Sequence, residues 1–217
     1  MRKIALIVAG GNGKRMNSEI PKQFLLLHNE PILIHTLKQF SHFEKIILVL
    51  PKTQFEYWEK ITEKYNFNLP LILAKGGKNR FQSVKNGLAK ITEVAIVAIH
   101  DGVRPLVSKT LINRLVSKTK KGAGIIPVIP IKDSLRRIEQ NKSKHVDRDN
   151  LYQVQTPQCF ISTDIQNSYT QKFCKHFTDD SSIFEKAGGK IETIAGDNKN
   201  LKITTIEDLK LAEIFMQ

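Results

Sequence analysis

The sequence predicts an α/β fold with a mainly parallel sheet and helices on both of its faces. Two continuous apolar runs, 3–9 and 45–50, end at glycine or proline, which is typical of strands buried on both faces of a parallel sheet. Segments with helical spacing lie between such runs, and alternating strands and helices indicate an α/β sandwich. The length of 217 residues predicts one domain, 1–217, because domains usually have about 100–200 residues.

The elements expected in the first half alternate regularly. Pro31 suits the first turn of a helix, and Leu33, Leu37 and Phe40 follow it at helical spacing. Pro51 ends the second apolar run. The expected ranges are a strand over 3–9, a helix from Pro31, a strand over 45–50, a helix over 54–65, a strand over 71–74 and a helix over 80–90.

The second half continues the same alternation. Ser108 is a favourable N-cap for a helix whose apolar positions are 111, 112, 115 and 116. Residues 205–208 have the form of a capping box, which marks the start of the last helix. The other expected ranges are strands over 94–99, 123–128 and 190–195 and a helix over 162–176.

Residues 130–155 depart from this alternation. The segment is rich in charged side chains and holds only short β-like pieces. One interpretation is a long surface hairpin. The other is a β-arm that contacts a second subunit, because a two-stranded ribbon is only marginally stable by itself. The residues alone leave both interpretations open.

Composition and charge narrow the class of protein. Apolar residues make up 41% and charged residues 25% of the chain, as in ordinary globular proteins, which argues against disorder. No apolar stretch approaches the ~20 residues that span a bilayer, and the two cysteines lack CxxC spacing, so we expect a soluble protein of the reducing cytoplasm. The net charge of +13 suits an anionic partner: nucleic acid, a membrane surface or a phosphorylated small molecule. Many lysines also simply coat the surface.

A glycine-rich loop follows the first predicted strand. It contains Gly10, Gly11 and Gly13, with Arg15 and then Lys22 nearby. Glycines let backbone N–H groups approach phosphates, and the cations neutralise phosphate charge. The loop matches neither the P-loop nor the dinucleotide fingerprint, because the Ser or Thr of the former and the third small residue of the latter are missing. A tight turn is the alternative interpretation.

Two further loops follow strands whose ends meet at the same edge of such a sheet. After the fourth predicted strand, Asp101 is suited to a divalent cation or a sugar hydroxyl, and Arg104 to an anionic or hydroxylated substrate. The alternative is an Asp–Arg pair that braces the loop. The loop 76–80, with Ser83, offers groups that could read a base edge, or forms an ordinary helix N-terminus.

The remaining candidates favour structural roles. His28, His35 and His42 are spaced seven residues apart, but Pro31 prevents one helix from carrying all three. We therefore do not expect a metal site there. His100 is expected to pack at a strand end. Asp179 and Asp180 precede a short helix and are expected to cap it rather than form a metal or acid–base dyad. No Ser-His-Asp or Cys-His arrangement is recognisable.

Five stretches together resemble the 2-C-methyl-D-erythritol 4-phosphate cytidylyltransferase family of the non-mevalonate isoprenoid pathway. They are Ala9-Gly-Gly-Asn-Gly-Lys-Arg-Met16 with Pro21-Lys-Gln-Phe24, His100-Asp-Gly-Val-Arg-Pro105, Asp147-Arg148, Gln155-Thr-Pro-Gln158 and Asn200-Leu-Lys-Ile-Thr204. The resemblance covers nearly the whole chain in order. It implies a Rossmann-like nucleotidyltransferase fold with a protruding β-arm over 130–155 used for dimerisation.

The resemblance also implies roles for individual residues. The loop around the CTP phosphates corresponds to Ala9, Gly10, Gly11 and Gly13, and the cytosine segment to Gly77, Arg80 and Ser83. The pair said to stabilise the transition state corresponds to Arg15 and Lys22, and the ribose, metal and substrate-hydroxyl contacts to Asp101 and Arg104. The positions that hold methylerythritol phosphate correspond to Ser134, Arg148, Thr156 and Lys202, the first two reaching over from the neighbouring subunit.

The implied reaction joins CTP to 2-C-methyl-D-erythritol 4-phosphate, with Mg²⁺ as cofactor, in a homodimer that binds neither nucleic acid nor membrane. Lys78 departs from the family pattern, because relatives often carry an acid there. Ribitol 5-phosphate is the alternative acceptor, since a ribitol-5-phosphate cytidylyltransferase is a close relative. A basic nucleic-acid-binding protein is the alternative from another class, although aromatic residues are only 7% of the chain.

Overall fold

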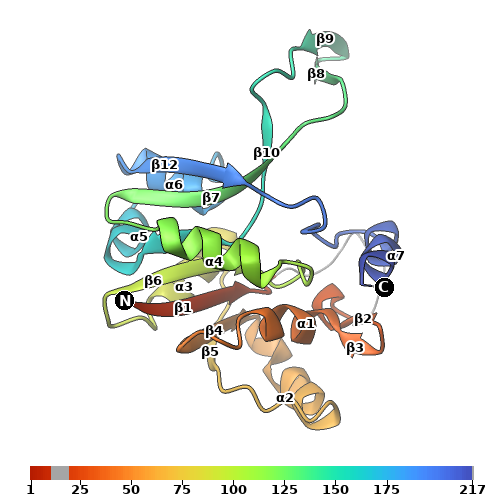
Figure 1. Ribbon diagram of the computed structural model, residues 1–217, viewed down its shortest axis with the longest axis vertical. Coiled ribbons are helices and arrows are strands. Elements are labelled where there is room, and N and C mark those ends of the chain that lie inside the picture. Colours follow the sequence, from red (N-terminus) through yellow and green to blue (C-terminus); the bar gives the residue numbers. More distant parts are fainter. Residues whose placement is uncertain (11–19, 217) are drawn as a thin grey trace.

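The structure is a computed structural model that describes residues 1–10 and 20–216. A twisted sheet of eight described strands runs through its centre, in the order β10-β7-β11-β6-β1-β4-β5, with β12 also paired to β7 (Figure 1). Its strands are β1 (Arg2–Val8), β4 (Lys45–Leu50), β5 (Ile72–Lys75), β6 (Ala95–Asp101), β7 (Ala123–Pro130), β10 (Tyr152–Val154), β11 (Gln158–Ile161) and β12 (Lys190–Ala195).

The other elements surround this sheet. The helices are α1 (Ile32–Gln39), α2 (Phe55–Lys64), α3 (Arg80–Leu88), α4 (Lys109–Lys118), α5 (Ser162–Ser168), α6 (Asp180–Lys186) and α7 (Ile206–Phe215), with short 3-10 turns η2 (Lys22–Phe24) and η3 (Lys52–Gln54). Two small hairpins complete the described chain, β2 (Leu26–Leu27) with β3 (Glu30–Pro31), and β8 (Leu135–Glu139) with β9 (Lys142–Val146).

The central strands are parallel, which brings their carboxyl ends together. Strand β1 lies between β4 and β6 and is parallel to both, and Val8 is in register with Val49 and with Asp101. β5 is parallel to β4, whereas β11 and β10 run antiparallel to their neighbours. The expected α/β fold with a mainly parallel sheet is confirmed.

Alternating residues of β1 belong to two hydrophobic cores, one on each face of the sheet. Ile4 and Leu6 face α3, α5 and α6, whereas Ala5 and Ile7 face α1, α2 and α4. All four side chains are inaccessible to solvent. A strand with no polar face is what the continuous apolar run predicts. Helix α7 packs on a third, smaller core formed with Leu27, Ile32, Val103 and Ile203.

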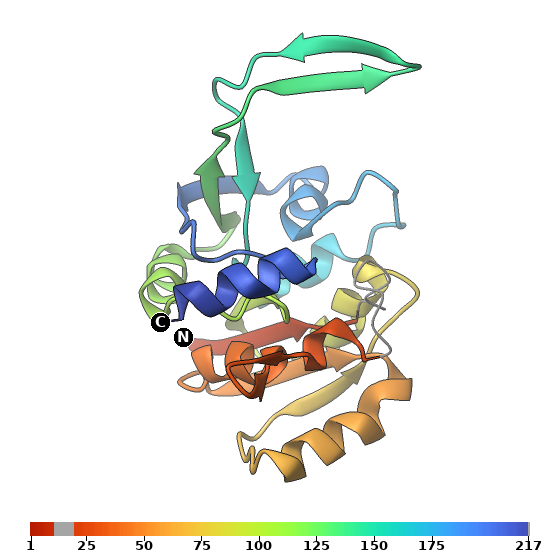
Figure 2. The same ribbon diagram turned by 90° about the vertical axis from the view of Figure 1, so that its right-hand side faces the viewer.

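The segment 130–155 leaves the body of the protein. Strands β8 and β9 form a protruding hairpin, and β10 then returns to pair with β7 (Figures 1 and 2). The turn of the hairpin uses Gln140 and Asn141, both with positive φ, as a tight two-residue hairpin turn requires. Ile138 on this hairpin is 71% exposed. The excursion from the core expected from the sequence is therefore present as a protruding hairpin, which is called the β-arm below.

Several expected boundaries are wrong, and two of them have a clear structural reason. Strand β6 continues to Asp101 rather than ending at Ile99, because its pairing with β1 extends that far. The helix expected over 162–176 ends at Ser168, where Gln171 Nε2 donates to the carbonyls of Ser168 and Ile183 and so terminates α5 against α6. Within the described residues no helix is long and apolar enough to cross a bilayer.

Candidate active site

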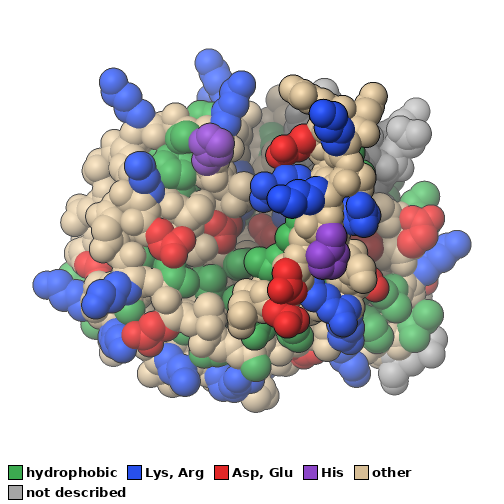
Figure 3. All heavy atoms as spheres, turned by 90° about the horizontal axis from the view of Figure 1, so that it is seen from above, with side chains coloured by type: hydrophobic (Ala, Val, Ile, Leu, Met, Phe, Trp, Pro, Cys, Tyr) green, Lys and Arg blue, Asp and Glu red, His purple; other side chains and the backbone are tan. Residues whose placement is uncertain are grey.

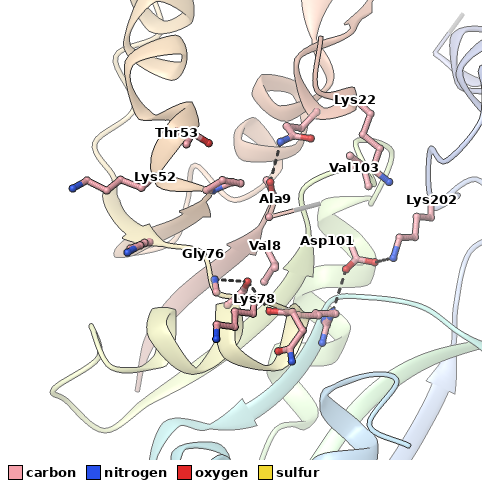
Figure 4. Close-up of a pocket in the computed structure, with 18 residues that line it drawn as sticks. Val8, Ala9, Lys22, Lys52, Thr53, Gly76, Lys78, Asp101, Val103 and Lys202 are labelled. Atoms are coloured by element: carbon pink, nitrogen blue, oxygen red, sulfur yellow. Dashed lines mark hydrogen bonds and ion pairs between the residues drawn. The ribbon is translucent and has the colours of Figure 1, made fainter. Parts of the chain in front are cut away.

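A pocket of about 810 Å³ opens beyond the carboxyl ends of β1, β4, β5 and β6 (Figure 4). Ligands of open α/β sheets bind at this edge. The described residues that line it are Val8, Ala9, Gly10, Lys22, Gln23, Pro51, Lys52, Thr53, Lys75, Gly76, Gly77, Lys78, Asn79, Arg80, Ser83, Asp101, Val103 and Lys202.

The charge of the pocket is strongly positive. Five lysines and one arginine line it against one carboxylate, that of Asp101, among the described residues. Lys52 and Lys202 lie on opposite sides of the pocket in Figure 4. A concave site with this excess of cations suits a ligand that carries several negative charges, such as a nucleoside triphosphate.

Backbone groups of the loop after β5 are held in place by Ser83. The Ser83 hydroxyl accepts a hydrogen bond from the Gly77 N–H at 3.0 Å and donates to the Asn79 carbonyl at 2.9 Å. Asn79 caps α3 by accepting from the Gln82 N–H. A side chain at position 77 would collide with Gln82, since a Cβ there would lie 2.3 Å from its Cγ. The loop therefore lines the pocket with a backbone that leaves no room for a side chain at position 77.

Asp101 ends β6 and meets three cations. Its Oδ2 lies 3.1 Å from Lys202 Nζ and 3.3 Å from Arg104 Nε, and its Oδ1 lies 3.8 Å from Arg80 Nε. Burial by itself would raise the pKa of Asp101, but the positive charges of Arg80, Lys202 and Arg104 outweigh it and hold the pKa well below its usual range. The carboxylate is therefore ionised at neutral pH.

Arg80 lines the pocket, and the end of its guanidinium pairs with a buried carboxylate. Its Nη1 and Nη2 donate to the two oxygens of Asp180 at 2.8 and 2.6 Å. Asp180 is inaccessible to solvent and also accepts a hydrogen bond from the Tyr169 hydroxyl. From the sequence we expected Asp179 and Asp180 to cap the helix rather than to form a dyad. Asp179 does cap α6, in a capping box with Ser182, whereas Asp180 forms this ion pair.

Lys22 and Gln23 connect the first loop to the pocket. Lys22 Nζ lies 3.4 Å from the Ile203 carbonyl, next to Lys202, and Gln23 Nε2 donates to the Ala9 carbonyl at 3.0 Å. Lys22 and Lys202 thus reach the same side of the pocket (Figure 4). Sequence reasoning missed Gln23, Lys52, Thr53 and Lys75 as lining residues. The position of 52–53 directly after the strand that Pro51 ends is the signal that could have found two of them.

The protein-family model of 2-C-methyl-D-erythritol 4-phosphate cytidylyltransferase, IspD, matches residues 3–217 of the sequence. The chain belongs to this family. A 2-C-methyl-D-erythritol 4-phosphate cytidylyltransferase of Bacteroides fragilis is 42% identical over 219 residues and covers 100% of both chains. One of Azobacteroides pseudotrichonymphae is 46% identical over 218 residues, covering 98% of this chain and 97% of its own.

Solved cytidylyltransferase structures share the fold of this family member. The enzyme of Thermus thermophilus superposes with a TM-score of 0.82 at 26% identity, over 99% of this chain and 98% of its own. The 4-diphosphocytidyl-2C-methyl-D-erythritol synthase of Anaerococcus prevotii superposes with a TM-score of 0.81 at 29% identity, over 100% of this chain and 96% of its own.

The residues expected from the cytidylyltransferase resemblance fall into four groups. The pocket brings together Ala9, Gly10, Lys22, Gly77, Arg80, Ser83, Asp101 and Lys202. Ser134 and Arg148 lie exposed at the base of the β-arm and do not line this pocket. Gly11, Gly13 and Arg15 lie outside the described residues.

Arg104 and Thr156 lie behind the pocket rather than lining it. Arg104 Nη1 donates to the Asn200 carbonyl at 2.8 Å while Nε faces Asp101, so the bracing pair considered from the sequence is present. Thr156 is 5% exposed and contacts Asp101 and His100. His100 is inaccessible to solvent, as predicted for a histidine packed at a strand end.

The histidines that were considered as metal ligands from the sequence lie away from the pocket. The described residues contain no group of three or more His, Cys, Asp and Glu side chains that could hold a metal ion. His35 Nε2 contacts the Leu27 carbonyl, and His28 Nε2 contacts the Glu213 carbonyl in α7. These histidines therefore serve separate local contacts.

Proposed function

We propose that this family member transfers the cytidylyl group of CTP to 2-C-methyl-D-erythritol 4-phosphate and releases pyrophosphate. A phosphate oxygen of the alditol phosphate attacks the α-phosphorus of CTP, a new P–O bond forms, and the bond to the bridging oxygen of the leaving pyrophosphate breaks. The observation that carries this proposal is the cationic pocket at the carboxyl edge of the sheet, in a chain that matches the family over 3–217.

The chemistry does not require a general base. A phosphate monoester has a second pKa near ~6, so the nucleophile is mostly a dianion at neutral pH. Asp101 is the acidic group among the described lining residues, and its cationic neighbours lower its pKa too far for it to take a proton. The site instead has to hold two anions together, which is the task that fixed cations perform.

We assign to these residues the roles that the family resemblance implies, and the described ones among them line the pocket or lie beside it. Lys22, with Arg15 from the loop outside the described residues, stabilises the charge that develops at the α-phosphate. Ala9 and Gly10, with Gly11 and Gly13, cradle the triphosphate, while Gly77, Arg80 and Ser83 recognise cytosine. Lys202 and Arg104 orient Asp101, and Lys202 also contacts the alditol phosphate. Thr156 supports this region from behind.

The donor set at Asp101 fits Mg²⁺ as cofactor. Mg²⁺ is usually bound by one or two carboxylates together with substrate phosphates rather than by an all-protein cage. Asp101 supplies one carboxylate, and its Oδ1 accepts no hydrogen bond from the described residues and lies 3.8 Å from Arg80 Nε. When bound, the ion would neutralise phosphate charge and orient the triphosphate.

The β-arm supports a homodimer with shared sites. Ser134 and Arg148 are exposed on the arm, and Tyr152 and Val154 at its base are 53% and 42% exposed. An exposed ribbon of this kind gains stability from a second copy. In the proposed dimer each arm brings Ser134 and Arg148 to the alditol phosphate of the neighbouring subunit. Cytoplasmic location stays a prediction from the sequence.

The distribution of charge gives the nucleic-acid alternative little support. Figure 3 looks down on the face that carries the arm and shows Lys and Arg side chains spread around it, interspersed with acidic groups. A nucleic-acid-binding surface usually gathers its cations in one patch or stripe. A phosphorylated small molecule in the pocket accounts for the placed cations without such a surface.

The function is tested by following pyrophosphate release with CTP and Mg²⁺. Parallel reactions contain 2-C-methyl-D-erythritol 4-phosphate, ribitol 5-phosphate or no acceptor, and a second series replaces CTP with ATP, GTP or UTP. We expect release with CTP and methylerythritol phosphate and little in the other reactions. Equal or faster release with ribitol 5-phosphate would contradict the proposed acceptor.

A further inference from the structure

The two carboxylate oxygens of Asp101 are used unequally. Oδ2 faces both Lys202 Nζ and Arg104 Nε, at 3.1 and 3.3 Å. No described residue donates a hydrogen bond to Oδ1, and Arg80 Nε stays 3.8 Å from it, beyond hydrogen-bond distance. Oδ1 therefore keeps acceptor capacity on a side chain that lines the pocket.

Arg80 does not move closer to Asp101 Oδ1 because Asp180 holds its guanidinium. Both Nη atoms donate to Asp180, a bidentate arrangement that fixes the plane of the guanidinium. Asp180 is inaccessible to solvent and accepts a third hydrogen bond, from the Tyr169 hydroxyl. Moving Arg80 toward Asp101 would leave Asp180 charged and buried without its main partner, which is strongly unfavourable.

We propose that Asp180 is a positioning residue that holds Arg80 away from Asp101 and so leaves Asp101 Oδ1 open to the divalent cation that accompanies the nucleotide. This inference rests on the proposed function. Without Asp180, the Nη donors of Arg80 lose their acceptors, and Asp101 Oδ1 is the nearest carboxylate oxygen that Arg80 already faces. A guanidinium on Oδ1 would both occupy that oxygen and repel the cation.

A purely structural role for Asp180 is the competing explanation. The ion pair also joins α3 to α6, and removing one member of a buried pair lowers stability whatever its effect on the pocket. The two explanations differ in how Asp180 and Arg80 depend on each other. A positioning role requires Arg80 to be present, whereas a structural role persists, at least in part, when Arg80 is replaced.

The test measures Mn²⁺ binding in the presence of CTP and without acceptor, by the EPR signal of free Mn²⁺, so that no turnover is involved. The proteins are wild type, Asp180→Asn, Arg80→Met and the double variant. Tyr169→Phe is the matched control, because it removes one hydrogen bond from Asp180 but keeps the bidentate pair. Thermal unfolding of each variant checks that it folds. If Asp180→Asn does not fold, Asp180→Ser, which admits water beside the guanidinium, replaces it.

We expect Asp180→Asn to weaken Mn²⁺ binding by about tenfold, the effect of one charge-assisted contact. The double variant should bind Mn²⁺ as Arg80→Met does, and Tyr169→Phe as wild type does. Unchanged Mn²⁺ binding in Asp180→Asn would overturn the positioning role, and so would an equal loss of binding with Arg80 present and with Arg80 replaced by Met. In either case, pyrophosphate release by the wild type would leave the proposed function intact. Absence of CTP-dependent Mn²⁺ binding in wild type, together with absence of pyrophosphate release, would refute both.

Discussion

The Thr156 hydroxyl accepts a hydrogen bond of 3.1 Å from the backbone N–H of Asp101. The same oxygen lies 3.0 Å from His100 Nδ1. His100 Nε2 faces the Arg104 carbonyl, which only accepts, so Nε2 carries the proton and Thr156 donates to Nδ1. One threonine thus fixes the end of β6 from which Asp101 enters the pocket.

Replacing Thr156 with Val tests this support. Val has nearly the same shape but leaves the buried Asp101 N–H without an acceptor, which typically costs about 1–3 kcal/mol. Thr156→Ser keeps the hydroxyl and should lose about 1 kcal/mol or less, from one methyl group. Urea unfolding of the two variants measures the difference. Equal losses in Val and Ser would show that the hydroxyl does not hold the strand end.

Lys22→Ala should reduce turnover far more than CTP affinity. Removing one preorganised charge that stabilises a transition state typically lowers kcat by ~10²–10³. Steady-state kinetics with CTP varied at saturating acceptor measures both quantities. Lys118→Ala is the control, because Lys118 is an exposed lysine at the end of α4 outside the pocket. Near-normal kcat in Lys22→Ala would remove Lys22 from the catalytic assignment.

Arg148→Ala should raise KM for methylerythritol phosphate and leave KM for CTP nearly unchanged. Lys144→Ala removes another exposed charge from the same arm and serves as the control. A change confined to CTP affinity would contradict the arm assignment.

Mixing subunits tests whether the arm acts across a dimer. Lys22→Ala and Arg148→Ala chains, each poorly active at low acceptor concentration, are unfolded, mixed in equal amounts and refolded together. In a shared-site dimer one site of each heterodimer is intact, so random mixing should restore about a quarter of wild-type activity. No gain over the separately refolded variants would show that each site draws both residues from one chain.

His100 should make the fold sensitive to acid. Burial lowers the pKa of His100 to about 4, although contacts with Arg104 and Asp101 oppose the shift. The unfolded chain binds this proton near pH ~6.5, so stability is retained above that pH and is lost as the pH falls toward 4. The contribution is about 3 kcal/mol.

The measurement is urea unfolding of wild type and His100→Asn at intervals between pH 7 and 4. The variant has no titrating side chain at this position, so its stability should fall less steeply over that range. Parallel pH profiles for the two proteins would show that protonation of His100 does not contribute.

Local patterns predicted much of the fold because their causes are local. Ser108 caps α4 by accepting from the Leu111 N–H, and Thr205 and Asp208 form the expected capping box of α7. The helix expected over 162–176 was too long because what ends it, the Gln171 contact with Ile183, depends on α6 folding back. Spacing alone does not contain that information.

The loops that form the candidate site were predictable from the sequence, but the hydrogen bonds and ion pairs between them were not. Strand β1 ends two residues before Gly10 and the parallel β6 ends at Asp101, which places both residues at one edge, as the sequence indicated. The pairing of Arg80 with Asp180 joins residues 100 positions apart, and no local pattern links them. Thr156 was expected at the alditol phosphate, whereas its burial behind Asp101 becomes visible only when β6 and the segment before β11 are placed together.

The measurement that tests the central claim most directly is a crystal structure of the protein with CTP. We predict that the triphosphate lies between Gly10 and Lys22, with cytosine against the Gly77 to Ser83 segment and the ribose near Asp101. Electron density for CTP outside this pocket, distant from both Lys22 and Ser83, would contradict the account.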